Sequence, residues 1–279
     1  MPHPADRVCD RFRADGFVRM DRFLDDGEVA EVRDTVNALP AVPFDATCAR
    51  PNNTLVPLRF SDAVVETLLG SPRRIRRLAD TVEARDLRWI SGYVSIKEPR
   101  SAALSWHQDW WCWSHPISFG VRPVQVALLC YLTQTDCSRG ALRVLPGSHL
   151  RGDPLHGALS EADPTDGPLA ANHAAMSDHP EQVTVSAHPG DAVVLDYRVL
   201  HGTHANSADC RRDCVLLSFT PAWSDLPEDL RAHLIQHPAQ PRDGESPRAA
   251  LAGLMPTFGG VRRDLPLDRD PPSEFAVRA

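Results

Sequence analysis

The sequence predicts a mainly β protein with flanking helices, because short β-rich runs follow one another from Leu87 onward with no long helical stretch between them. Gly, Pro, Asp and Ser separate these runs, as expected for turns. Parallel strands need long crossover connections, so the short spacing favours antiparallel strands in a sandwich or barrel. The runs expected to be strands are LRWISGYVSI, VQVALLCYL, ALRVLP, QVTVSAHPGDAVVLDYRVL and CVLLSFTPAW.

Helices are expected mainly before the strands. Residues 5–38 are expected to be helical, with Asp25 and Asp26 as candidate N-caps of an apolar-periodic stretch. Residues 40–60 are rich in Pro and Asn and are expected to be irregular. The other segments expected to be helical are 62–84, 226–236 and 247–254.

The whole chain, residues 1–279, is expected to form a single domain, since this length suits one large core. We expect an N-terminal helical part (1–86), a β core (87–222) and a C-terminal extension (223–279). Residues 151–181 interrupt the strands, and a loop of this length in a compact domain often covers a binding site.

Composition excludes several classes of protein. The formal net charge of −7 argues against a nucleic-acid-binding module, which normally has a basic surface. No apolar run approaches the roughly 20 residues that span a membrane, and no signal peptide is visible. The seven cysteines are scattered without the spacing of a zinc site, so we expect reduced thiols. A soluble cytoplasmic protein follows as the expectation.

The segment from Ser105 to Pro116 concentrates the chemically active side chains. On an extended strand, residues two apart point to the same face, so His107 and Asp109 are expected to lie side by side. His201 ends a second apolar strand and can supply another imidazole. Two histidines and one carboxylate form the facial triad of non-haem Fe(II) oxygenases, which leaves positions open on the metal.

Four features in order resemble the phytanoyl-CoA dioxygenase family. They are the H-x-D sequence at 107–109, the run GALRVLPGSH at 140–149, His201-Gly-Thr, and an arginine eleven residues after that histidine. The opening FRADGFV at 12–18 is also similar. The resemblance covers roughly residues 10–222. It implies a double-stranded β-helix core (jelly-roll, cupin-like) and an oxygenase that uses Fe(II), 2-oxoglutarate and O2.

The resemblance also assigns roles to individual residues. His107, Asp109 and His201 match the metal ligands and hence the catalytic centre, and Arg212 matches the arginine that binds the distal carboxylate of 2-oxoglutarate. A guanidinium suits that role because its planar fork pairs bidentately with a carboxylate. Arg211 is the adjacent alternative, because both faces of the following strand are apolar.

Two further residues are expected at the cosubstrate. Thr203 shares a face with His201 and matches a hydroxyl that helps to bind the same carboxylate. Lys97 is the only lysine of the chain and lies where related proteins place a lysine that contacts 2-oxoglutarate. The alternative for Lys97 is a side chain that merely faces solvent.

Trp110, Trp111 and Trp113 follow the H-x-D sequence closely. Aromatic clusters usually fill cores, but the short distance to a metal ligand leads us to expect at least one of the three at the substrate. Gln108 is expected to point away from the metal.

The predicted activity is hydroxylation of a C–H bond in a small organic molecule, with release of succinate and CO2 and with ascorbate as an activator in vitro. The range of substrates that the resemblance implies, together with the chain's Arg, Ala and Pro content, suggests bacterial secondary metabolism. Desaturation, epimerisation or oxidative cyclisation on the same scaffold is the alternative, and a non-catalytic ligand-binding protein is another. The substrate and the oligomeric state do not follow from the sequence.

Overall fold

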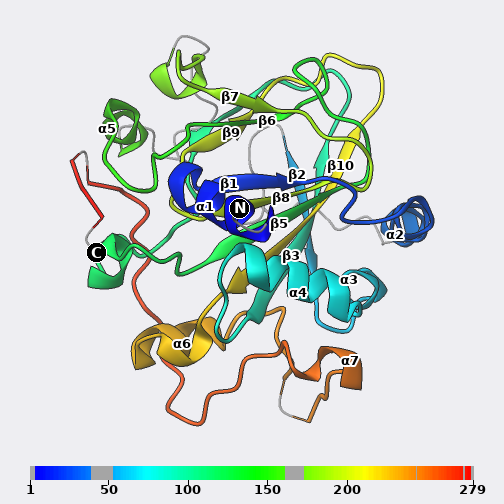
Figure 1. Ribbon diagram of the computed structural model, residues 1–279, viewed down its shortest axis with the longest axis vertical. Coiled ribbons are helices and arrows are strands. Elements are labelled where there is room, and N and C mark those ends of the chain that lie inside the picture. Colours follow the sequence, from blue (N-terminus) through cyan, green and yellow to red (C-terminus); the bar gives the residue numbers. More distant parts are fainter. Residues whose placement is uncertain (1–3, 39–52, 161–172, 243, 273, 278–279) are drawn as a thin grey trace.

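Two antiparallel β-sheets form the centre of the computed structural model, which describes residues 4–38, 53–160, 173–242, 244–272 and 274–277 (Figure 1). The strands are β1 (Phe17–Met20), β2 (Thr54–Leu58), β3 (Arg88–Lys97), β4 (Leu104–His107), β5 (Val126–Tyr131), β6 (Leu142–Val144), β7 (Val183–Val185), β8 (Ala192–Asp196), β9 (His201–Thr203) and β10 (Arg212–Thr220). A six-stranded sheet has the order β1-β8-β5-β10-β3-β2, and a four-stranded sheet has the order β4-β9-β6-β7. The expected mainly β, antiparallel architecture is confirmed.

The helices lie around these sheets. They are α1 (Pro4–Asp15), α2 (Asp26–Ala38), α3 (Ala63–Leu69), α4 (Pro72–Thr81), α5 (Pro154–Ser160), α6 (Glu228–Leu234) and α7 (Ala249–Ala252), with short 3-10 turns η1 (Pro116–Phe119), η3 (Ala174–Met176) and η4 (Trp223–Asp225). None of the helices in the described parts of the chain is long and apolar enough to cross a membrane.

Alternation along β10 shows how the six-stranded sheet divides its two faces. Cys214 and Leu216 pack in the cluster between the two sheets. Val215 and Leu217 pack on the opposite face, in a cluster that includes the helices α2, α3 and α4. Residues of β10 with even numbers therefore face the four-stranded sheet, where the predicted site lies.

The N-terminal segment is not the continuous helical stretch expected for residues 5–38, because β1 interrupts it. Gly16 adopts a φ of +78°, which ends α1 and favours glycine. Val18 and Met20 are then buried in strand pairing with β8. The expected cap is present before α2, because the Asp25 carboxylate accepts a hydrogen bond from the Glu28 amide at 2.9 Å.

Two other expectations near the N-terminus were wrong in part. Residues 54–58 form the edge strand β2 within the segment expected to be irregular, and Pro57 is tolerated there because an edge strand leaves some amides unpaired; residues 39–52 lie outside the described part. The expected helix over 62–84 is split into α3 and α4. Gly70 ends α3, and the Ser71 side chain caps α4.

The C-terminal helices α6 and α7 lie within the two segments expected to be helical. The insertion contains α5 and η3, while residues 161–172 lie outside the described part.

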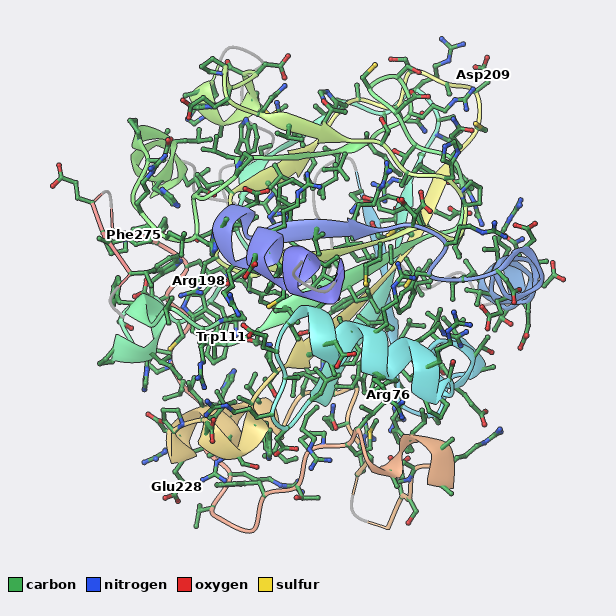
Figure 2. All side chains as sticks on the ribbon, in the orientation of Figure 1. Arg76, Trp111, Arg198, Asp209, Glu228 and Phe275 are labelled. Atoms are coloured by element: carbon green, nitrogen blue, oxygen red, sulfur yellow. The ribbon has the colours of Figure 1, made fainter. Side chains whose placement is uncertain are left out.

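A buried ion pair fixes the connection between β8 and β9. Arg198, labelled in Figure 2, is 1% exposed, binds the Asp196 carboxylate at 2.8 Å and donates to the carbonyls of Ser118 and Gly120.

Candidate active site

Two histidines face each other across neighbouring strands of the four-stranded sheet. His107 ends β4, His201 begins β9, and the two are paired in register. Their ring centroids are 4.2 Å apart. The Nδ1 atom of His107 lies 2.9 Å from the Ser105 carbonyl, and that of His201 lies 3.0 Å from the Val199 carbonyl. A carbonyl can only accept, so each Nδ1 carries the proton and each Nε2 carries a lone pair suited to a metal.

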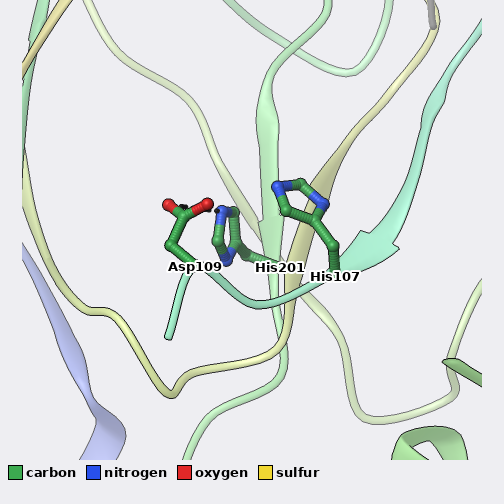
Figure 3. A group of neighbouring side chains, drawn as sticks. All are labelled: His107, Asp109 and His201. Atoms are coloured by element: carbon green, nitrogen blue, oxygen red, sulfur yellow. Dashed lines mark ion pairs between the residues drawn. The ribbon is translucent and has the colours of Figure 1, made fainter. Parts of the chain in front are cut away.

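Asp109 completes a group of three potential metal ligands. One ligand atom from each of His107, Asp109 and His201 lies within 4.8 Å of the others (Figure 3). The Asp109 Oδ2 atom is 3.6 Å from His201 Nε2, and its side chain is only 10% exposed. Two imidazoles and one carboxylate fit a divalent metal such as Fe(II) in its facial arrangement.

The local structure at Asp109 differs from the expected strand. β4 ends at His107, so Asp109 lies beyond the sheet and alternation alone does not place its side chain. The amides of Asp109 and Trp110 both donate to the Tyr197 carbonyl, each at 2.9 Å. This carbonyl belongs to the connection that leads to His201, and it therefore links the third ligand to the second.

Two buried cations face the same interior from the six-stranded sheet. Lys97 at the end of β3 and Arg212 at the start of β10 are cross-strand partners, with exposures of 0% and 4%. Burial, together with the nearby positive charges of Arg212 and Arg143, lowers the pKa of Lys97 to about 7. Arg212 Nε has no hydrogen-bond partner among the described residues. This interior is therefore suited to an anion.

The two neighbouring arginines point in opposite directions. Arg212 faces the interior, where its Nη1 lies 3.5 Å from the Ser95 hydroxyl. Arg211 is 38% exposed and binds Asp213 at 2.9 Å and Asn37 at 2.6 Å. The geometry thus favours Arg212 as the interior guanidinium.

Thr203 lies on the same face of β9 as His201, two residues further along the strand. Its side-chain oxygen accepts a hydrogen bond from the Leu104 amide at 3.4 Å, and the residue is 8% exposed. The side-chain amide of Gln108 donates to the Arg269 carbonyl at 3.3 Å.

The three tryptophans lie in a packed hydrophobic cluster with residues of α6. The Trp110 indole donates to the Ser118 hydroxyl at 2.9 Å, and the Trp111 indole donates to the Gln125 side chain at 2.6 Å. Trp113 is 1% exposed. Substrate contact by one of them stays a prediction, and Trp111, with 7% of its surface exposed, retains the most surface.

Sequence reasoning overlooked a partly exposed pair inside the molecule. Tyr93 and Leu216 are cross-strand partners on the inward face, and each is less buried than its neighbours in the strand. Tyr93 Oη lies 3.5 Å from His237 Nε2. Counting back by two from Lys97 through Ser95 would have placed Tyr93 on the cosubstrate face.

Comparison with known proteins identifies relatives over most of the chain. The profile of the phytanoyl-CoA dioxygenase (PhyH) family matches residues 12–214. A probable alpha-ketoglutarate-dependent hypophosphite dioxygenase from Stutzerimonas stutzeri is 25% identical over 166 residues, which are 60% of this chain and 56% of the relative. The ectoine dioxygenase of Nocardia farcinica is 28% identical over 241 residues, with 79% of each chain covered.

Solved structures show the same fold. The non-heme alpha-ketoglutarate-dependent epimerase SnoN from nogalamycin biosynthesis has a TM-score of 0.58 at 21% identity, with 94% of this chain and 98% of that chain covered. A second structure of SnoN contains Fe3+, alpha-ketoglutarate and nogalamycin RO. The likeness confirms the predicted jelly-roll fold class.

Proposed function

Because the chain belongs to the phytanoyl-CoA dioxygenase family, we propose that it is an Fe(II)- and 2-oxoglutarate-dependent oxygenase that hydroxylates a C–H bond of a small organic molecule. Succinate and CO2 are the co-products. The observation that carries this proposal is the convergence of His107, Asp109 and His201 in an interior that also contains two buried cations.

His107, Asp109 and His201 would hold the iron. The Nδ1 contacts to backbone carbonyls support this role, because they fix both the tautomer and the orientation of each ring. Iron and 2-oxoglutarate together supply the activation of O2. The protein then has to position both reactants and keep water out, since the cofactor performs the difficult chemistry.

Arg212 would bind the distal carboxylate of 2-oxoglutarate, with Lys97 and Thr203 beside it. The inward direction and burial of Arg212 support this assignment over Arg211, which already pairs with Asp213. A fork of two N–H donors matches a carboxylate, and Lys97 adds a second positive charge from the neighbouring strand.

The substrate would enter beside the metal. Trp110, Trp111 and Trp113 were the residues expected there, and Trp111 is the candidate we favour among them because it keeps some surface. Tyr93 and Leu216 are added as candidate contacts, because they are partly exposed on the inward face. The insertion at 151–181 and the C-terminal extension would shield the site.

Other outcomes on this scaffold depend on where the substrate lies, not on the metal ligands. SnoN is an epimerase and SnoK, another structural neighbour, is a carbocyclase, so epimerisation and oxidative cyclisation are alternative outcomes here, and desaturation stays the third alternative. A purely ligand-binding role is disfavoured, because the described structure keeps all three donors together with the interior arginine.

We further propose that residues 1–279 act as one domain and that the protein resides in the cytoplasm. Its partner would be a small molecule from bacterial secondary metabolism. We also propose that the protein binds no nucleic acid. The net charge of −7 supports the last point. Ascorbate would support activity in vitro by keeping iron reduced.

Succinate formation tests the proposed reaction. Purified protein with Fe(II), 2-oxoglutarate and ascorbate should form succinate in step with O2 uptake, slowly alone and faster with a substrate. The single variants His107→Ala, Asp109→Ala and His201→Ala should each lose at least about 100-fold of this rate while remaining folded by circular dichroism. Wild-type rates in any one of the variants would remove that residue from the site.

A further inference from the structure

The carboxylate ligand is held differently from the two histidines. His107 and His201 are fixed by strand pairing in the four-stranded sheet. Asp109 follows the end of β4, so the segment after His107 needs other contacts to keep its carboxylate within reach of the imidazoles. The Tyr197 carbonyl supplies the contacts on one side of this segment.

The C-terminal strap, which we define as the described residues from 264 to 277, supplies contacts to the same segment. The Asp268 amide donates to the Trp111 carbonyl at 2.8 Å, and the Trp113 amide donates to the Asp268 carbonyl at 3.1 Å. Gln108, which is 6% exposed, donates from its side chain to the Arg269 carbonyl at 3.3 Å. The strap thus binds the chain both before and after Asp109.

The strap is itself anchored at both ends. Near its start, the Leu265 amide donates to His233 of α6 at 3.1 Å. Near its end, the Phe275 carbonyl accepts from the Gly152 amide at 2.8 Å. The Phe275 ring, labelled in Figure 2, lies 5.0 Å from the Trp113 ring and 5.2 Å from the His156 ring. Because the strap is held at both ends, it can restrain the segment around Asp109 that it contacts.

We propose that the C-terminal strap is a positioning element for the metal site, with Gln108 and Phe275 as its positioning residues. Gln108 ties the residue before Asp109 to the strap, and Phe275 holds the strap against Trp113. Neither side chain belongs to the three ligands; each acts through the backbone that carries the carboxylate. The part of this proposal that concerns metal binding depends on the proposed function. The restraint of the segment around Asp109 by the strap does not.

Metal affinity is the first test, with Mn2+ alone as the probe, measured by isothermal titration calorimetry. Gln108→Met keeps the length of the side chain and removes its donor, and Phe275→Ala removes the anchor. Both variants should weaken Mn2+ binding on the order of ten-fold, as found for partners that orient metal ligands.

Two matched controls separate positioning from general stability. Gln240 is also buried and donates to the carbonyls of Trp89 and Ile90, far along the chain from the strap contacts. Phe258 is also a half-buried ring in the same hydrophobic cluster as Phe275. Gln240→Met and Phe258→Ala should lower the melting temperature and leave the Mn2+ dissociation constant unchanged. Equal Mn2+ affinity in all four variants and the wild type would overturn the proposal.

Hydrogen exchange gives a readout that needs no metal. In the metal-free protein, the amides of Asp109 and Trp110 should exchange at least about five-fold faster in Phe275→Ala than in Phe258→Ala, because local opening depends on the contacts that restrain a segment. Unchanged exchange would overturn the restraint. If the wild type failed to bind Mn2+ while exchange still responded to Phe275→Ala, the proposed function would fail and the restraint by the strap would stand.

Discussion

At the scale of single residues, the proposed binding of the cosubstrate depends on the choice between two adjacent arginines. Arg212 is buried beside Lys97, whereas Arg211 is paired with Asp213 at the surface. Arg212→Ala should weaken 2-oxoglutarate binding by roughly 10- to 100-fold, since a charge-assisted bidentate contact contributes about 1.5–3 kcal/mol. Arg211→Ala should change it less than about two-fold. Titration of 2-oxoglutarate into the Mn2+-loaded variants measures both, and the opposite ranking would exchange the two roles.

If Lys97 contacts the cosubstrate as proposed, the binding of 2-oxoglutarate should depend on pH. Burial and the charges of Arg212 and Arg143 lower its pKa from 10.5 to about 7, so the ammonium is lost as the pH rises through 7 in the protein without cosubstrate. A dianionic cosubstrate binds the protonated form more tightly. Its dissociation constant should therefore rise on the order of ten-fold between pH 6.5 and 8.5 in the wild type.

The control for this pH effect is Lys97→Met, which removes the titrating group and keeps an unbranched chain in the buried position. Its 2-oxoglutarate affinity should be lower at pH 6.5 and nearly independent of pH. The lowered pKa also makes the stability of the fold depend on pH. The unfolded chain keeps a proton on Lys97 up to about pH 10.5, whereas the folded chain loses it near pH 7. The free energy of unfolding should therefore increase as the pH rises from about 7 to 10.5. An equal pH slope in Lys97→Met and the wild type would contradict the assignment.

Residue types and spacing, together with the resemblance to a known family, predicted that His107, Asp109 and His201 meet. They could not reveal that Asp109 lies beyond a strand or that Lys97 is fully buried, because both depend on segments distant in the sequence. The tryptophans illustrate a further limit. Their closeness to a ligand along the chain suggested the substrate site, yet hydrogen bonds from Trp110 and Trp111 to Ser118 and Gln125 also stabilise a packed cluster.

At the scale of elements, β-rich runs bounded by turn residues predicted the long strands and also the short strands β6 and β7, but they overlooked β1 and β2. β1 lies between two helices and has only four residues, so its alternation is too short to compete with the helical periodicity around it. β2 contains Pro57, which normally argues against a strand and is accepted here at a sheet edge. Both strands are edges that complete a sheet whose centre the sequence predicts clearly, and neither carries a site residue.

The short strands β4 and β9, unlike β1 and β2, carry residues of the proposed site. They contain four and three residues, yet they carry two of the three potential metal ligands and Thr203. Their positions depend on pairing with each other and with β6, not on a strong local pattern. The contacts of the C-terminal strap were likewise not predicted, because many of them join backbone amides and carbonyls of segments that are distant in the sequence.

At the scale of the whole molecule, the two sheets contribute complementary halves of the proposed site. The four-stranded sheet contributes His107 and His201, and the six-stranded sheet contributes Lys97 and Arg212. A cosubstrate that chelates the metal at one end and binds the cations at the other would therefore connect the sheets. Separation of the two sheets during unfolding would then require release of both the metal and the cosubstrate. Metal and cosubstrate should therefore stabilise the fold cooperatively.

Thermal unfolding measures this connection. A ligand that binds only the native state at 100 times its dissociation constant adds about 2.7 kcal/mol of stability. Mn2+ and 2-oxoglutarate together should raise the melting temperature by more than the sum of their separate shifts, because the cosubstrate needs the metal at one end. Arg212→Ala should retain the shift from Mn2+ and lose most of the additional shift from 2-oxoglutarate. Purely additive shifts in the wild type, or an undiminished 2-oxoglutarate shift in Arg212→Ala, would mean that the cosubstrate does not connect the two sheets through this arginine.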